Sequence, residues 1–381
     1  MDFNHTGEQA ALADSVRRFC DDNIDLASHR RDGRSPSDTR LWRQIADLGW
    51  LGAGLSEEEG GFGGGPVESA IIAEAFGRSL AVEPYVSSAV LSVRTLLASG
   101  GSAASLIESI VLGERTVALA CCEPEGRGDP SHVSARAERK GGGYRLSGRK
   151  SLVLGGANAD FHLVSARTSG DVRDDDGVTL FRIERAHPGL RRQDYRLVDR
   201  RMACDLWLDD LEVGADAVVG EPDQASGAIR EGVDHGIAAI CADSLGAMDR
   251  ALWITRDYLK TRKQFGQTLS SFQALQHRMA DMLVELELSR SMLYAALAAL
   301  ALGADKRSRG VSAAKAVIGK AGIFIGQQAI QLHGGIGMTE EYAVGHYYKR
   351  LLANASLFGS IDAHIERYAA LSGGEPASVL F

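Results

Sequence analysis

A short polar connection between two helical patterns carries the side chains best suited to bind an anion. The helical periodicity breaks at Gln264-Phe265-Gly266 and resumes at Ser271-Phe272-Gln273. Cationic and amide side chains fill this connection, namely Arg262, Lys263, Gln264, Gln267 and Gln273. Such donors match the oxygens of a pyrophosphate. The same residues also fit a helix–loop–helix whose charged corner is simply solvated, so the pattern alone leaves both interpretations open.

One carboxylate stands inside an otherwise apolar helical run. Asp243 lies between Ile237 and Leu245. Burying an ionised carboxylate without a partner is costly. Asp243 is therefore either a structural carboxylate paired with a cation or a group kept for chemistry such as proton transfer.

The composition excludes several classes of protein. The 381 residues include 42 Lys and Arg against 50 Asp and Glu, a formal net charge of −8. This charge, and the lack of basic runs interleaved with aromatic residues, argues against a nucleic-acid surface. No stretch approaches the roughly 18 apolar residues that span a membrane. The first residues show no cationic region followed by an apolar one, so we expect no secretory signal and a cytoplasmic location.

Cysteine and histidine spacing gives no sign of a metal site. The five cysteines are an odd number without any C-x-x-C spacing, and the ten histidines show no paired spacing such as H-E-x-x-H. We expect reduced thiols and no metal.

The predicted secondary structure changes twice along the chain, from helical to β-rich and back to helical. Residues 6 to 112 have helical spacing, and Thr6 with Gln9 predicts a capping box at the first helix. From about Thr116 the chain turns to short β-rich runs separated by turn clusters, typical of an antiparallel β domain. Four long helical segments follow, at Ile229 to Thr261, Phe272 to Leu302, Ser308 to Leu332 and Glu341 to Tyr368. Long helices joined by short loops indicate a four-helix bundle. We therefore expect an α+β protein with an N-terminal α-helical domain (1–115), a middle antiparallel β domain (116–225) and a C-terminal bundle (226–381).

Two long strings of residues resemble motifs of the acyl-CoA dehydrogenases, flavoproteins that oxidise acyl-CoA thioesters. The first runs from Arg262 to Met282, and the second is Q-L-H-G-G-I-G-M-T-E-E-Y at residues 331–342. They occur in the order and at the separation of that family, and the α, β, α-bundle order also matches its architecture. The resemblance implies an FAD cofactor, an acyl-CoA substrate, an electron-transfer flavoprotein as acceptor and a tetrameric assembly.

The resemblance also assigns cofactor contacts, residue by residue. Arg262, Phe265 and Gln273 would reach the flavin nucleotide of a neighbouring subunit, and Gln331, Gly334 and Gly335 would line its adenosine and pyrophosphate portion. An arginine suits a diphosphate, and glycines allow close backbone approach. On the chain's own flavin, the resemblance places Cys122 in the loop over the ring, Leu154 where a threonine hydroxyl is usual, and Ser360 in the final turn.

The catalytic base of the family is missing from both of its usual positions. Leu357-Phe358-Gly359-Ser360 stands where the commonest Glu precedes Gly-Thr, and the alternative position aligns with Gly236. Asp243 lies seven residues after Gly236. On a helix this spacing is almost two full turns, so the two residues point in directions that differ by roughly 20° around the helix axis. Asp243 is therefore the candidate base, with a paired structural carboxylate as the alternative.

Within the family, the chain most resembles the small-subunit subgroup of pimeloyl-CoA dehydrogenase. It is also similar to actinobacterial steroid side-chain enzymes, which pair two unlike subunits. Three hypotheses follow: a dehydrogenase that uses Asp243, a non-catalytic partner that completes the FAD site of a second subunit, and an acyl-CoA-binding flavoprotein without turnover. The assembly would be a homotetramer or a heterotetramer, and the sequence does not specify the acyl group.

Overall fold

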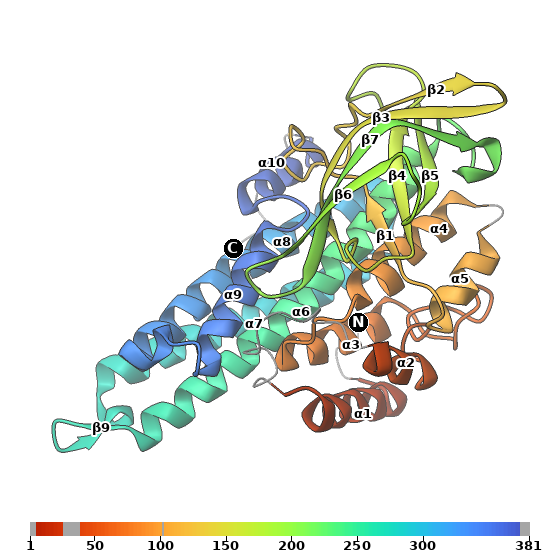
Figure 1. The fold of residues 1–381 in the computed structure, drawn as a ribbon. Helices are drawn as coiled ribbons and strands as arrows, with labels where there is room; N and C mark the ends of the chain where they lie inside the picture. The colour runs from red at the N-terminus through yellow and green to blue at the C-terminus, as the bar shows by residue number, and fades with distance from the viewer. Residues whose placement is uncertain (1–4, 26–38, 101–102, 374–381) are drawn as a thin grey trace.

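The computed structural model describes residues 5–25, 39–100 and 103–373, which form a helical region, a β-sheet and a long helical bundle (Figure 1). The N-terminal region is helical, as predicted. The predicted capping box is present, because the Gln9 backbone N–H donates to Thr6 Oγ1 at 3.2 Å and the Thr6 N–H donates to Gln9 Oε1 at 3.1 Å. The helices are α1 (Gly7–Asn23), α2 (Thr39–Asp47), α3 (Pro66–Ser79), the π-helix η2 (Tyr85–Ser92), α4 (Val93–Ser99) and α5 (Ala104–Val111).

The middle region is an eight-stranded sheet in the order β6-β7-β3-β2-β4-β5-β8, with β1 beside β4. Most neighbouring strands are antiparallel, but β1 pairs with β4 in parallel, and so does β2 at one position. The sheet is therefore mostly antiparallel, as predicted, with parallel neighbours only at β4 among the described residues. Its strands are β1 (Val117–Ala120), β2 (Arg136–Lys140), β3 (Gly143–Leu154), β4 (Phe161–Arg167), β5 (Val178–Glu184), β6 (Leu190–Arg196), β7 (Met202–Gly214) and β8 (Val218–Val219).

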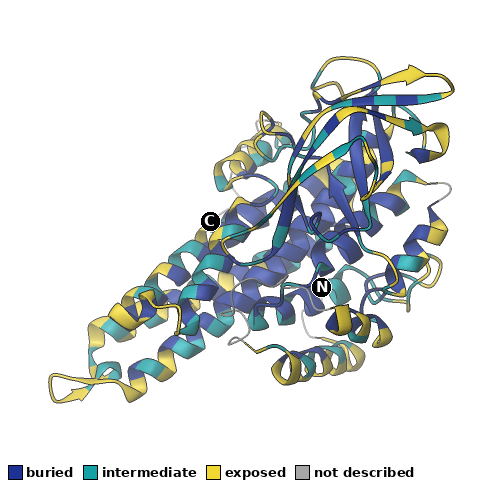
Figure 2. Cartoon of the chain, viewed as in Figure 1, coloured by how far each residue is buried: buried dark blue, intermediate teal, exposed yellow. Residues whose placement is uncertain are grey.

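The C-terminal region is a bundle of long helices whose inner faces are buried (Figures 1 and 2). The helix predicted from Glu341 to Tyr368 is in fact two helices, because Phe358 and Gly359 adopt φ values of 59° and 108° that end the helical path. The helices are α6 (Ala225–Thr261), α7 (Gln273–Ala299), α8 (Ala304–His333), α9 (Ala343–Ser356) and α10 (Ile361–Leu371). None of the helices in the described residues is both long and apolar enough to cross a membrane.

Helices α3 and α6 cross in backbone contact at two glycines. A Cβ atom added to Gly77 of α3 would lie 1.9 Å from the carbonyl oxygen of Asp243, and one added to Gly246 of α6 would lie 1.8 Å from that of Glu74. Neither position has space for a side chain, so these glycines bring the N-terminal helices directly against the segment of α6 that carries Asp243.

Candidate functional site

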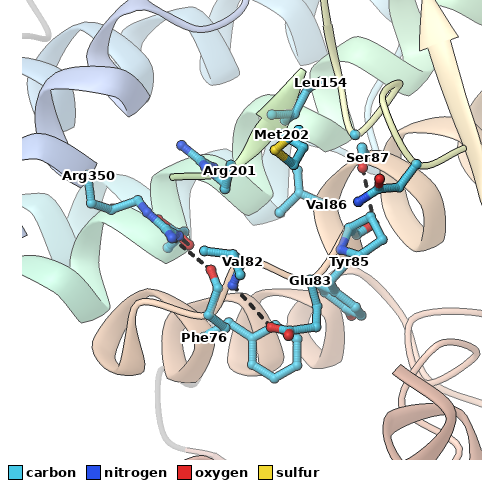
Figure 3. A pocket seen from close by; sticks show the side chains of 15 residues that line it. Phe76, Val82, Glu83, Tyr85, Val86, Ser87, Leu154, Arg201, Met202 and Arg350 are labelled. Carbon is cyan, nitrogen blue, oxygen red and sulfur yellow. Dashed lines mark hydrogen bonds and ion pairs between the residues drawn. The ribbon is translucent and has the colours of Figure 1, made fainter. Parts of the chain in front are cut away.

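A small cavity lies where the N-terminal helices, the sheet and the bundle meet (Figure 3). Its free volume is about 30 Å³. Binding sites for small organic ligands usually enclose roughly 300–1,000 Å³, so the side chains around this cavity nearly fill it. The residues around it come from all three regions and include Phe76, Glu83, Tyr85, Leu154, Asp243 and Arg350.

A buried polar network forms one wall of the cavity. Arg350 Nη1 donates to Asp243 Oδ2 at 2.9 Å, and Asn354 Nδ2 donates to Asp243 Oδ1 at 2.6 Å. Arg350 also forms an ion pair with Asp199 at 2.9 Å, and Asp199 accepts a hydrogen bond from Arg201 Nε at 2.6 Å. Burial alone would lower the pKa of Arg350, but the Asp243 and Asp199 carboxylates outweigh it and raise that pKa. Both oxygens of Asp243 are therefore engaged by donors from α9.

A second buried ion pair anchors the loop that follows β1. Lys150 Nζ lies 2.6 Å from Glu123 Oε1, and both side chains are inaccessible to solvent. Glu123 also accepts from the backbone N–H groups of Ser134 at 2.7 Å and Ala135 at 3.0 Å. Burial raises the pKa of Glu123, but the Lys150 charge and these hydrogen bonds outweigh it and lower that pKa. The pair fixes the chain directly after Cys122, which is partly buried.

Two loops from different regions are in contact with each other. A Cβ atom added to Gly128 would lie 2.7 Å from the Gly359 nitrogen, so the loop after Cys122 packs on the turn between α9 and α10. In that turn the carbonyl oxygen of Phe358 lies 3.0 Å from His364 Nε2. Ser360 Oγ accepts from the Ala363 N–H at 3.2 Å, which makes Ser360 the N-cap of α10. The final turn therefore presents an aromatic residue and a helix cap, and no carboxylate.

The residues of the two long motifs lie at the other end of the bundle. Beyond α6 the chain forms the hairpin β9 (Lys263–Gln264) and β10 (Gln267–Thr268), which projects from the molecule (Figures 1 and 2). Phe265 at its tip is 90% exposed. Arg262 and Gln273 are also exposed, and Arg262 has no ion-pair partner within the described part of the chain.

An aromatic contact holds the second motif beside the first. The rings of Tyr258 on α6 and His333 on α8 stack with centroids 4.4 Å apart, and the Tyr258 hydroxyl donates to the His333 carbonyl at 3.3 Å. His333 Nδ1 lies 2.7 Å from the Ala329 carbonyl oxygen, and burial lowers the pKa of His333. His333 therefore has the structural role that a histidine at a helix end usually has, and it positions the residues that follow it.

Gln331, Gly334 and Gly335 are exposed at this end of the bundle. No atom lies within 4 Å of a Cβ added to either glycine, so their backbone groups are open to a ligand. Together with the exposed cation of Arg262, these open backbone groups fit the diphosphate and adenosine portion of FAD. The residues that the sequence assigned to the cofactor are thus not all in one place. Leu154 and Asp243 border the cavity, and the two motifs lie at the far end of the bundle. Cys122 and Ser360 lie in the loop after β1 and at the N-cap of α10, outside the lining of the cavity.

Among the described residues, one cluster of potential metal ligands lies in the loop after β1. Ligand atoms of Glu123, Glu125 and His132 lie within 4.8 Å of one another. The Glu123 carboxylate is already bonded to Lys150, Ser134 and Ala135. We therefore assign no metal ion to this cluster.

The polar partners of Asp243 were missed at the level of sequence. Arg350 and Asn354 sit four residues apart on the buried face of α9, which also carries Tyr347 and Leu351. Two polar residues at the spacing of an apolar helix face are the signal that could have identified them.

Comparison with known proteins gives the family. The models of the acyl-CoA dehydrogenase N-terminal, middle and C-terminal domains match residues 6–105, 118–211 and 226–371. The chain belongs to the acyl-CoA dehydrogenase family, and it is therefore an oxidoreductase of an FAD-dependent class. Members of this family oxidise acyl-CoA thioesters in general.

The relatives and structural neighbours align over almost the whole chain. L-prolyl-[peptidyl-carrier protein] dehydrogenase from Serratia sp. (strain ATCC 39006) is 26% identical over 96% of this chain and 97% of its own. The Tcur3481-Tcur3483 steroid ACAD G363A variant is 30% identical with a TM-score of 0.85, covering 97% of this chain and 99% of that one. A chain of the ChsE4-ChsE5 complex from Mycobacterium tuberculosis is 27% identical with a TM-score of 0.87, covering 99% and 100%. These neighbours include both a steroid enzyme and an assembly of two named subunits.

Proposed function

We propose that this chain is a subunit of an assembled acyl-CoA dehydrogenase that converts an acyl-CoA thioester to the 2-enoyl-CoA. The observation that carries the proposal is the position of Arg262 relative to the cavity. Asp243 and Arg262 both lie at α6, 19 residues apart in the numbering. At 1.5 Å per residue they are separated by roughly 28 Å along the helix axis. Arg262 therefore cannot contact a group bound in the cavity of its own chain, and with Phe265 and Gln273 it would contact the FAD of a neighbour.

The assembly we propose is a tetramer in which each hairpin completes a neighbouring cofactor site. The exposed Phe265 supports this arrangement, because a large aromatic side chain at the tip of a projecting hairpin is typical of a surface that another chain covers. Gln331, Gly334 and Gly335 would hold the adenosine and pyrophosphate of the same FAD molecule. Cys122, Leu154 and Ser360 would lie toward the FAD of their own chain.

The proposed chemistry needs a proton acceptor next to the substrate. FAD, when bound, supplies the hydride acceptor, and electron-transfer flavoprotein would reoxidise it. We assign the removal of the α-proton to Asp243, which with Glu83 supplies the carboxylates around the cavity in the described residues. A carboxylate has about four lone-pair sites, and Arg350 and Asn354 each engage one oxygen of Asp243. An unused lone pair would accept the proton.

A second candidate function is that of a non-catalytic partner within a heteromeric dehydrogenase. Three points support it: the family resemblance puts Phe358 at the usual position of the base, Arg350 pairs with Asp243, and the cavity encloses only about 30 Å³. In this case the hairpin would complete the FAD site of a second, catalytic subunit, and no acyl group would be oxidised in this chain.

Purification of the chain alone, and together with a second acyl-CoA dehydrogenase subunit from the same source, distinguishes these functions. We would measure FAD per chain, the mass by light scattering, and anaerobic bleaching of the flavin by a panel of acyl-CoAs that includes dicarboxylyl and steroid-ring thioesters. Bleaching by the chain alone supports the Asp243 mechanism, and bleaching only with the second subunit supports the non-catalytic role. FAD and acyl-CoA binding without any bleaching would identify a flavoprotein without turnover. An FAD-loaded monomer near 40.7 kDa would contradict the shared site.

A further inference from the structure

Cys121 and Cys122 are consecutive residues whose sulfur atoms lie on the same side of the chain. Their Sγ atoms are 3.9 Å apart. Successive side chains of an extended strand point to opposite faces, so this proximity depends on the end of β1 at Ala120. Cys121 is buried and Cys122 is partly exposed. The structure therefore holds a buried thiol next to the thiol of a residue that is only partly buried.

The surroundings lower the pKa of the outer cysteine. A hydrogen bond from Cys121 lowers the pKa of Cys122, burial opposes this effect, and the positive charge of Lys150 adds to the lowering. The same hydrogen bond and burial raise the pKa of Cys121. In contrast, burial raises the pKa values of Cys20, Cys204 and Cys241 to about 12. Cys122 is thus the one cysteine of the five whose surroundings lower its thiol pKa.

We propose that Cys121 and Cys122 form a reversible oxidation site in which a peroxide converts the two thiols into a disulfide between adjacent residues. The Cys122 thiolate attacks one oxygen of the peroxide and becomes a sulfenic acid, while the other oxygen leaves and is protonated to water when the oxidant is hydrogen peroxide. The Cys121 sulfur then attacks the Cys122 sulfur, the S–S bond forms, and the sulfenic oxygen leaves as a second water. Two thiols are oxidised and one peroxide is reduced.

The backbone makes this bond easy to reverse. Consecutive Cα atoms are about 3.8 Å apart, which is shorter than the usual separation of roughly 4.4–6.8 Å across a disulfide. Such a bond is strained, and strained disulfides are the ones that cellular thiols reduce readily. The site is therefore suited to a transient modification, and both cysteines are free thiols in this structure.

Oxidation would be transmitted to the cavity through strand β3. The Ser151 N–H donates to the Cys122 carbonyl oxygen at 2.9 Å, and Leu154 at the end of β3 borders the cavity. Closing the small ring changes the backbone at Cys122 and so weakens the hydrogen bond to Ser151. The proposal concerns a covalent modification, and it holds whether or not this chain carries the catalytic base.

Mass spectrometry of the full-length protein tests the proposal directly. Trypsin releases residues 116–127 as one peptide that contains Cys121 and Cys122 and no other cysteine. After treatment with a few equivalents of hydrogen peroxide, we expect this peptide to lose about 2 Da, the mass of two hydrogen atoms, and to resist alkylation. Dithiothreitol should restore two alkylatable thiols. In Cys121→Ser, Cys122 should instead be trapped by dimedone as a sulfenic acid.

Cys204→Ser is the matched control, because Cys204 is a buried thiol in the same sheet, and it should leave the loss of mass unchanged. Alkylation of both cysteines in the treated wild-type peptide would overturn the proposal. Oxidation of Cys122 to the sulfinic acid without any loss of about 2 Da would overturn it as well.

Discussion

Asp243 of α6 and Arg350 of α9 form an ion pair that is almost completely buried, with Arg350 Nη1 donating to Asp243 Oδ2 at 2.9 Å. The pair borders the cavity and joins two helices that are more than 80 residues apart in the chain. Removing one partner of a buried pair leaves the other charge uncompensated. Asp243 therefore stabilises the fold whatever its role in catalysis, and an experiment on this residue has to separate the two contributions.

We predict that Asp243→Asn slows flavin bleaching by about 10²–10⁴-fold, the usual contribution of a positioned general base. It should also lower the melting temperature, because Arg350 loses a counter-charge. The measurement is stopped-flow bleaching under anaerobic conditions, combined with thermal unfolding. Asp199→Asn is the matched control, since Asp199 pairs with Arg350 in the same network but does not border the cavity. Equal bleaching rates in the two variants would remove Asp243 as the base.

We predict that Arg262→Ala weakens the retention of FAD in the assembled protein. Hydrogen bonds to charged groups contribute about 1.5–3 kcal/mol, which corresponds to roughly a 10- to 150-fold increase in the dissociation constant. FAD per chain after exhaustive dialysis is the measurement. Lys263→Ala removes the neighbouring exposed cation of the same hairpin and should have a much smaller effect. Full FAD occupancy in Arg262→Ala would show that this residue does not contact the cofactor.

Lys150→Met should destabilise the protein by about 3–5 kcal/mol, because it leaves the Glu123 carboxylate buried without its cation. Denaturant unfolding gives this difference in the free energy of unfolding. Lys140→Met removes the cation of the exposed pair with Glu212 on the same sheet, and we expect little change. If both substitutions lower the free energy of unfolding by the same amount, burial does not determine how much the Lys150–Glu123 pair contributes to stability.

Stability should decrease as the pH falls from about 6.5 to about 4. Burial lowers the pKa of His162 and of His364 to about 4 and that of His235 to about 3. In this pH range the unfolded chain protonates these side chains and the folded chain does not, so protons favour unfolding. At pH 5 the effect is roughly 2 kcal/mol for each histidine.

Melting temperatures of His364→Gln between pH 7.5 and 4.5 test whether buried histidines cause the loss of stability at low pH. The variant should show a shallower decrease than the wild type, because it lacks one of the groups that protonate on unfolding. His277→Gln changes an exposed histidine on α7 and should keep the wild-type slope. A His364→Gln slope identical to that of the wild type would contradict the prediction.

The sequence predicted helices and strands well where a single apolar periodicity dominates. It did not predict the elements whose formation or ends depend on tertiary contacts. The helices and most strands follow their apolar patterns. Strand β6 has no such pattern, because L-R-R-Q-D-Y-R is polar and largely exposed, and only its pairing with β7 makes it a strand. The parallel neighbours of β4 depend on connections between distant segments, which no local pattern encodes. The break between α9 and α10 depends on a positive φ at Phe358, a residue with no preference for that conformation.

The same limit applies to the site. The two long motifs identified the hairpin and the glycine turn because their residues are close in sequence. The surroundings of Asp243 depend on Asp199, Arg350 and Asn354, which come from a loop of the sheet and from α9. Their proximity is a product of packing, so sequence alone left the structural and catalytic interpretations of Asp243 equally open.

The glycine crossing of α3 and α6 limits how this protein can admit a ligand. At Gly77 and Gly246 the two helices pack backbone against backbone, with no space for a side chain between them. A hinge motion between the N-terminal helices and the bundle would have to break this contact. We therefore expect the segment of α6 that carries Asp243 to keep its position against α3 when a ligand binds. Room for an acyl group must come from the other side, through rearrangement of side chains such as Tyr85 and Leu154 or of the loops beside them. Selection for a larger or smaller substrate would then act on those residues while the crossing stays constant.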